Sequence, residues 1–192
     1  MSSDIGGYVR SDEKLVWKGR PQQGIRLYAQ DAFMLPFGLL WGGGVVAVFG
    51  AGWREFSAAP LPFSLFPLIF LLAAAYITIG RLAHDAWIRS RIAYALTDRR
   101  VIILRRGGDL TTLEIGRISQ IRFRPRGDRA DIIFGPAPSM FSLFGARSFR
   151  ASFSLWVPAL SDTPQFIGVE NGRRLFDQIE DARARMRSAA RD

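Results

Sequence analysis

The sequence predicts a membrane-anchored α+β chain, with a two-helix transmembrane hairpin followed by a seven-stranded antiparallel barrel and a C-terminal capping helix. Three observations support this fold class. Residues 32–53 and 56–80 contain no charged side chain, the segments after residue 91 alternate between apolar and polar residues, and the residues after Asn171 follow a helical period. The predicted parts are a cytoplasmic N-terminal tail (1–31), the hairpin (32–80), a helical stalk (81–90) and a cytoplasmic barrel domain (91–192).

The two apolar segments are long enough to cross a bilayer. As a helix, residues 32–53 would extend over about 33 Å, and the hydrocarbon core of a bilayer is about 30 Å thick. The second span covers residues 61–80 and has prolines near its start, where a helix tolerates them best. Because only about eight residues connect the spans, the helices must run antiparallel, and both tails lie on one side of the membrane.

The distribution of basic residues predicts the orientation. Lys and Arg number 26, with five before the first span, one (Arg54) between the spans and twenty after the second. Cytoplasmic loops carry the excess of Lys and Arg, so both termini of this multi-pass chain are predicted to be cytoplasmic. The net charge of +9 fits an anionic membrane surface.

A stripe of small residues, Gly38, Gly42, Gly43 and Ala47, follows one side of the first span. Small side chains let two helix backbones approach closely. We favour packing of the two spans against each other as the role of this stripe, and a homodimer remains open.

After residue 91 the chain reads as short strands separated by turns. The segment "RIAYALT" places Ile92, Tyr94 and Leu96 on one face, as expected of a half-buried strand. Further strands are predicted over residues 100–106, 110–115, around 121–123, over 130–134, 151–158 and 165–169. An amphipathic helix follows, with an apolar face of Leu175, Ile179, Ala182 and Met186.

Two motifs carry a family resemblance. The stretches "YALTDRRVIIL" (94–104) and "EKLVWKGRP" (13–21) resemble segments of bacterial membrane proteins with a pleckstrin-homology-like (PH-like) domain. The resemblance covers nearly the whole chain and implies a PH-like barrel in a multi-pass protein of the bacterial inner membrane, but it implies no defined activity. The chain departs from the simplest pattern of that family over residues 136–150.

Arginines at one end of the barrel are candidates for contact with lipid headgroups. Successive turns of a meander alternate between a membrane-near and a membrane-far end, and each basic residue close to an anionic leaflet contributes about 1 kcal/mol. The alternative is that these arginines only solvate the sheet surface. The turn "TDRR", taken as the first of the barrel, is too short for a specific phosphoinositide site. The membrane-near set comprises Arg81, Arg89, Arg91, Arg105, Arg106, Arg124, Arg126 and Arg129.

The connection 136–150 is a candidate protein-binding surface, since aromatic residues and arginine are enriched at the centres of interfaces. The alternative is that its phenylalanines cap the barrel core. The candidate residues are Phe141, Phe144, Arg147, Phe149 and Arg150.

The sequence offers little for catalysis. It has no cysteine and a single histidine, His84, so we expect no metal site, cofactor or enzymatic activity. Nucleotide-binding glycine motifs and the aromatic signatures of RNA-binding strands are lacking, so neither a nucleic acid nor a small-molecule substrate is expected. The predicted function is a non-catalytic interaction or scaffolding module with anionic-lipid contact and a protein partner. The alternative is an accessory subunit of a membrane enzyme or transporter, held through Gly38, Gly42 and Ala47.

Overall fold

The computed structural model describes residues 5–105, 107–136, 154 and 157–189. The chain forms two compact units, and one is inserted into the other. The β unit consists of Met1–Gly24 and Trp87–Asp192, and the hairpin unit consists of Ile25–Ala86. The chain therefore begins the β unit, leaves it after Gly24 to form the hairpin, and returns at Trp87 to complete the β unit.

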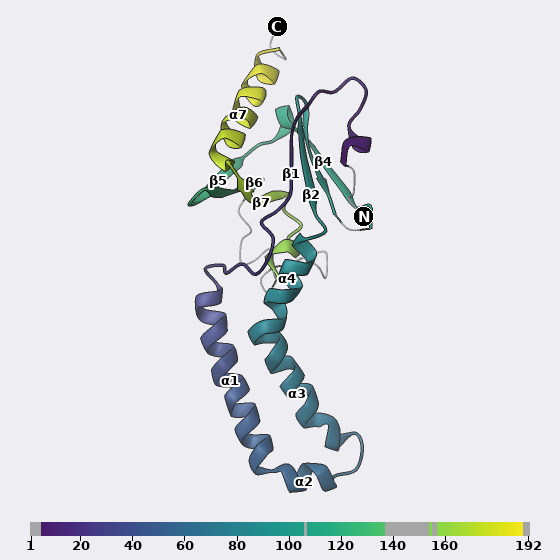
Figure 1. The fold of residues 1–192 in the computed structure, drawn as a ribbon, viewed down its shortest axis with the longest axis vertical. Coiled ribbons are helices and arrows are strands. Elements are labelled where there is room, and N and C mark those ends of the chain that lie inside the picture. Colours follow the sequence, from purple (N-terminus) through teal and green to yellow (C-terminus); the bar gives the residue numbers. More distant parts are fainter. Residues whose placement is uncertain (1–4, 106, 137–153, 155–156, 190–192) are drawn as a thin grey trace. The chain divides into compact units, whose positions relative to one another are not determined.

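The hairpin unit contains two helices that are long and apolar enough to span a membrane. The first is α1 (Asp31–Ala51), and the second is a continuous helical segment over Phe63–Arg89. That segment is built from η2 (Phe63–Leu65), α3 (Phe66–Ala75), a π-helical turn η3 (Tyr76–Gly80) and α4 (Arg81–Arg89). A short helix, α2 (Trp53–Ala58), lies in the connection. Helices α1 and α3 lie side by side (Figure 1).

Glycines of α1 permit this close packing. A Cβ atom on Gly38 would lie 2.7 Å from Oγ1 of Thr78, and one on Gly42 would lie 3.3 Å from Cβ of Ala74. Gly43 has no atom within 4 Å of such a position, and Ala47 is exposed. The predicted stripe therefore divides into Gly38 and Gly42, which face the second helix, and Gly43 and Ala47, which do not.

The β unit contains two antiparallel sheets. The first has the strand order β1-β2-β3-β4, formed by Leu15–Gly19, Ala93–Thr97, Arg100–Leu104 and Leu110–Glu114. The second has the order β5-β6-β7, formed by Ile121–Arg126, Arg129–Phe134 and Gln165–Glu170. Its described residues also form three short 3-10 turns (Ile5–Tyr8, Ile115–Arg117, Pro158–Leu160) and the final helix α7 (Gly172–Ala189).

Two features of the predicted barrel need correction. The sheets remain open and do not close into a barrel. One of the seven strands comes from the segment predicted to be a tail, because β1 pairs with β2 from Leu15↔Thr97 to Gly19↔Tyr94. Strand β1 also contacts the second sheet, because Trp17 packs against Phe166 of β7 with ring centroids 5.5 Å apart. The predicted strand 151–158 lies largely outside the described residues.

The main core lies between the sheets and α7. It includes Tyr94 and Leu96 of β2, Ile132 of β6 and Phe166 of β7, and the predicted apolar face of α7 packs there through Leu175 and Ile179. A second, smaller cluster covers the other face of the first sheet, where Ile5 and Val9 pack on Ala93, Ala95, Ile102 and Leu104. Both faces of β2 and β3 are therefore buried, since the N-terminal segment covers the outer one.

Candidate functional site

The "TDRR" turn holds the N-terminal segment in place. Oγ1 of Thr97 accepts hydrogen bonds from the backbone N–H groups of Arg99 and Arg100, which shapes the turn. Arg99 pairs with Asp12 at 2.9 Å, and Arg100 pairs with Glu13 at the same distance. The two motifs that carry the family resemblance thus contact each other through Glu13 and Arg100, which are 87 residues apart in the chain. This turn joins β2 to β3, whereas β1 and β2 are connected by the hairpin unit itself.

Tyr94, the first residue of the "YALTDRRVIIL" motif, links the two sheets. Its side chain is almost fully buried, and its hydroxyl oxygen accepts a hydrogen bond of 3.2 Å from the backbone N–H of Ile167 in β7. Burial raises the pKa of the Tyr94 phenol well above its usual value near 10. The hydroxyl therefore stays neutral and serves as a structural bridge.

Hydrogen bonds of Arg89 connect the point where the chain leaves the β unit with the point where it returns. Its guanidinium is fully buried and donates to the backbone carbonyl of Gln22, and Nη2 donates to the carbonyl of Gly24 at 2.7 Å. Gly24 is the last residue before the hairpin unit, and Arg89 lies two residues after the return at Trp87. Both ends of the insertion are therefore held next to each other within the β unit.

A buried ion pair lies inside the hairpin unit. Arg81 is paired with Asp31 at the start of α1, and its Nε donates to the carbonyl of Ile77 at 2.8 Å. One turn further along α4, Asp85 accepts a hydrogen bond of 3.2 Å from the hydroxyl group of Tyr28, which precedes α1. Asp31, Arg81 and Asp85 are each no more than 2% exposed. An ion pair removed from water holds its partners firmly, because breaking it leaves an uncompensated charge.

The eight arginines predicted to face lipid have different environments. Arg81 and Arg89 are buried and bound to protein oxygens, so the structure gives them a role in holding the fold instead of an open face for a headgroup. Arg91 stacks on Trp87 at 3.8 Å, and Arg105 donates to the carbonyl of Ser161 at 3.1 Å. Arg106 lies outside the described residues. Arg124, Arg126 and Arg129 belong to the β5–β6 hairpin, and the first two are exposed.

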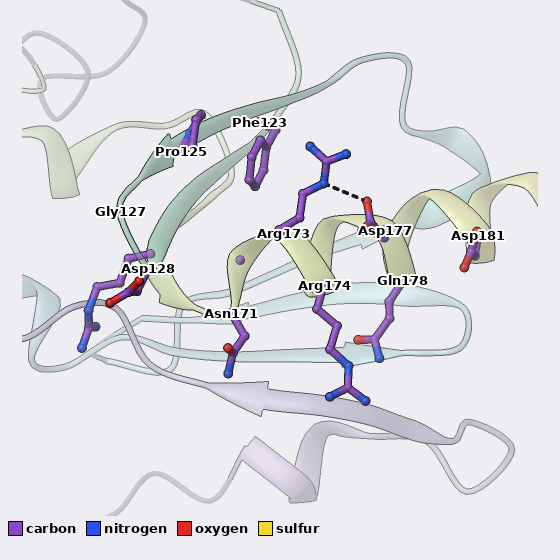
Figure 2. Close-up of a pocket in the computed structure, with 12 residues that line it drawn as sticks. Phe123, Pro125, Gly127, Asp128, Asn171, Arg173, Arg174, Asp177, Gln178 and Asp181 are labelled. Atoms are coloured by element: carbon purple, nitrogen blue, oxygen red, sulfur yellow. Dashed lines mark ion pairs between the residues drawn. The ribbon is translucent and has the colours of Figure 1, made fainter.

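A groove lies between the β5–β6 hairpin and α7 in the β unit. Its volume is about 910 Å³. Figure 2 shows Phe123 above the start of α7 and Arg173 reaching toward Asp177, with Arg174 and Gln178 projecting to a different side of the helix. The residues that line it are Phe123, Pro125, Gly127, Asp128, Arg129, Asn171, Gly172, Arg173, Arg174, Asp177, Gln178 and Asp181.

Charges of both signs line this groove. Arg173 forms an ion pair with Asp177 at 3.4 Å, and its guanidinium lies over the Phe123 ring, 5.7 Å from the ring centroid; the two contacts fix one wall of the groove. Gly172 cannot carry a side chain, because a Cβ atom would lie 2.4 Å from that of Ala130. In this way α7 begins directly against β6. Among the described residues no cluster of His, Asp or Glu could hold a metal ion. The arrangement suits recognition of a polar or charged surface by hydrogen bonds and ion pairs.

Sequence reasoning predicted a different interaction surface. Phe141, Phe144, Arg147, Phe149 and Arg150 all lie outside the described residues. The groove was missed because its two walls, residues 123–129 and 171–181, come together only through the packing of α7 on the second sheet. One signal was present in the sequence, since the first turn of α7 carries two arginines and no acidic residue, which is unusual next to the positive end of a helix.

Comparisons of the chain with protein-family models, with curated proteins and with solved structures gave no match.

Proposed function

We propose that this chain is an integral protein of the bacterial inner membrane whose β unit is a PH-like, non-catalytic interaction module in the cytoplasm. The observation that carries the proposal is the insertion of two span-length helices between β1 and β2 of one β unit. Arg89 holds both ends of that insertion together. Both covalent connections to the hairpin unit therefore leave the β unit at one place.

The strand arrangement supports the PH-like part of the proposal. Within the described residues, a four-stranded and a three-stranded antiparallel sheet followed by a helix supply the seven strands and the capping helix expected of that family, although β1 precedes the spans instead of following them. The residues of the "TDRR" motif also have defined structural roles, because they fasten the N-terminal segment that precedes β1.

The membrane orientation can be tested by cysteine labelling, since the natural chain has no cysteine. Ser57 in the connection between the spans and Thr112 on β4 are both exposed. In intact spheroplasts, a membrane-impermeant maleimide should label Ser57→Cys, and it should label Thr112→Cys only after permeabilisation. Labelling of both positions in intact spheroplasts, or extraction of the protein by carbonate without detergent, would contradict the proposal.

The groove of Figure 2 is the surface to which we assign a protein partner. A photo-crosslinking amino acid at Gln178 would lie in the groove, and one at the exposed Glu114 would not. We expect a discrete cross-linked product in cells only from position 178. Products of the same size from both positions would remove the groove from the proposal.

A second candidate function is an accessory subunit of a membrane enzyme or transporter. It is favoured by Gly43, which has open space around it, and by the exposed Ala47 one helical turn further along α1. Replacing both with Leu would block a partner helix there without touching the groove. If this double variant loses a co-purifying membrane complex while the Gln178 cross-link is unchanged, the accessory role is supported over the groove.

A further inference from the structure

A second, smaller cavity of the β unit carries a charge pattern that points to a ligand. It has a volume of about 490 Å³ and lies where the chain runs from β1 toward the hairpin unit. One wall is the segment from Trp17 to Gln23, and the other is formed by Arg129, Glu170 and Asn171. Three cations, Lys18, Arg20 and Arg129, meet one carboxylate, Glu170, at this cavity.

The three cations of the cavity differ in the contacts that they make with the protein. Arg129 pairs with Glu170 at 2.6 Å and also donates to the carbonyl of Gly168 at 3.2 Å. Lys18 and Arg20 are exposed, and within the described part of the chain neither has an acidic partner. The cavity therefore holds two positive charges in excess. Arginine suits phosphate in particular, because its planar fork can donate two parallel hydrogen bonds to phosphate oxygens.

The cavity wall is held in position by the fold. The backbone N–H of Gln22 donates to the carbonyl of Ile167 in β7 at 3.1 Å, and Arg89 binds the carbonyls of Gln22 and Gly24. The Trp17 ring lies over Gly19, where a Cβ atom would come within 2.3 Å of it. A wall held at several points loses little conformational freedom when a ligand binds, which favours affinity.

The covalent path limits how far this cavity can lie from the first span. Gln23 is followed eight residues later by Asp31, the first residue of α1. Eight residues extend over at most about 28 Å even when fully stretched. If the hairpin unit is anchored in a membrane, as proposed, lipid headgroups supply the phosphate groups closest to this cavity.

We propose that the cavity formed by Lys18, Arg20 and Arg129 binds the phosphate group of an anionic phospholipid headgroup. This inference rests on the proposed membrane anchoring of the hairpin. Lys18 and Arg20 were not among the residues predicted from the sequence to contact lipid headgroups, whereas Arg129 was. Glu170 acts against the ligand, because it occupies Arg129 in the empty cavity.

The test uses the full chain in a neutral detergent, with dihexanoyl phosphatidylglycerol, dihexanoyl phosphatidylcholine and inorganic phosphate as titrants in calorimetry. We expect binding of the phosphatidylglycerol and none of the phosphatidylcholine. The triple change Lys18→Gln, Arg20→Gln and Arg129→Gln should weaken binding about 100-fold, at roughly fivefold for each charge. A matched triple variant, Arg117→Gln, Arg185→Gln and Arg187→Gln, removes the same charge from exposed sites elsewhere. Because salt screens distant charges, this variant should change binding about twofold at most.

Glu170→Gln provides a test of opposite sign. It frees Arg129 and should tighten phosphatidylglycerol binding about fivefold, whereas Glu114→Gln, at an exposed ion pair with Arg117, should not. If Arg129→Gln impairs folding, as judged by circular dichroism, the double variant of the exposed Lys18 and Arg20 replaces the triple variant.

Three outcomes would overturn the proposal. They are equal weakening by both triple variants, weaker binding by Glu170→Gln, and equally tight binding of inorganic phosphate, which would make a soluble phosphate the ligand. Membrane insertion is scored separately by the cysteine labelling. A chain that binds phosphatidylglycerol in detergent but does not insert would contradict the proposed function and leave the cavity chemistry intact.

Discussion

Apolar and charged side chains are distributed in opposite ways in the hairpin unit and the β unit. In the hairpin unit, large apolar residues such as Leu39, Leu40 and Leu72 are exposed, while Asp31 and Arg81 are buried. In the β unit, Tyr94, Ile132 and Phe166 are buried, and most charged side chains face outward. Water favours the second pattern and disfavours the first. This difference is what we expect if hydrocarbon surrounds the hairpin unit, as the proposed function requires.

The two units also differ in how deeply their ion pairs are buried. The pair Arg81–Asp31 is almost entirely removed from solvent, with exposed fractions of 1% and 2%, while Arg173 and Asp177 of α7 are 76% and 56% exposed. Exposed pairs contribute little because water and salt screen them. A buried pair contributes through the high cost of losing one partner.

The largest expected effect follows from breaking the buried pair. Arg81→Met should lower the free energy of unfolding by about 3–5 kcal/mol, because Asp31 would remain as a buried unpaired charge. Arg173→Met, its exposed counterpart, should cost less than about 1 kcal/mol. Unfolding in mixed micelles of dodecyl maltoside and SDS, followed by circular dichroism, measures both. Adding Asp31→Asn to Arg81→Met should recover part of the loss, and equal effects of the two single variants would remove the contrast between the units.

The next effect concerns helix packing in the hairpin unit. Gly38→Leu should destabilise the hairpin by about 3 kcal/mol, because its Cβ would collide with the Thr78 side chain and force the helices apart. Gly43→Leu places the same side chain in open space and should leave hairpin stability nearly unchanged. The same micelle assay compares them. A Gly43→Leu variant as unstable as Gly38→Leu would show that the open side of α1 is covered by a further helix.

A smaller effect is expected in the β unit from removal of one hydroxyl group. Tyr94→Phe should cost about 2 kcal/mol, because the backbone N–H of Ile167 would be left buried without its acceptor. Tyr8→Phe, at a position that is 42% exposed, is the matched control and should be close to neutral. Chemical denaturation followed by the near-ultraviolet signal of the β unit distinguishes the two.

The same tyrosine gives the β unit a pH dependence. Burial raises the pKa of Tyr94, so above pH 10 the unfolded chain loses this proton while the folded chain keeps it. The stability that Tyr94 contributes is complete below pH 10 and falls as the pH rises further. Tyr94→Phe should reduce the slope of stability against pH in that range, and an unchanged slope would assign it to other groups.

The smallest effect concerns the N-terminal segment. Arg100→Gln removes the largely buried pair with Glu13 and a hydrogen bond to the carbonyl of Tyr8, and should lower the local stability of residues 5–13 by about 1 kcal/mol. Arg99→Gln removes only the exposed pair with Asp12 and should have less effect. Hydrogen exchange of the amides in this segment would detect the difference. Equal exchange in both variants would contradict the role given to Arg100.

Much of the fold could be predicted from local patterns. The uncharged stretches of the hairpin, the strands from Tyr94 to Phe134 and the apolar face of α7 each depend on residues close together in the sequence. Strand β1 was missed because Leu15–Gly19 is short and mixed, and its place depends on β2 and on Phe166, about 80 and 150 residues away. The groove and the cavity of Lys18, Arg20 and Arg129 were missed for the same reason, since their walls come from distant segments.

The sequence alone determined which parts of the chain tolerate hydrocarbon, because that property depends only on the length and composition of a continuous segment. It also determined the period of each strand and helix. Only the tertiary structure decided that the hairpin is an insertion within the β unit, that Arg81 and Arg89 are buried, and that the paired arginines of "TDRR" hold the N-terminal segment. Each of these depends on which distant residues meet, and a one-dimensional pattern does not contain that information.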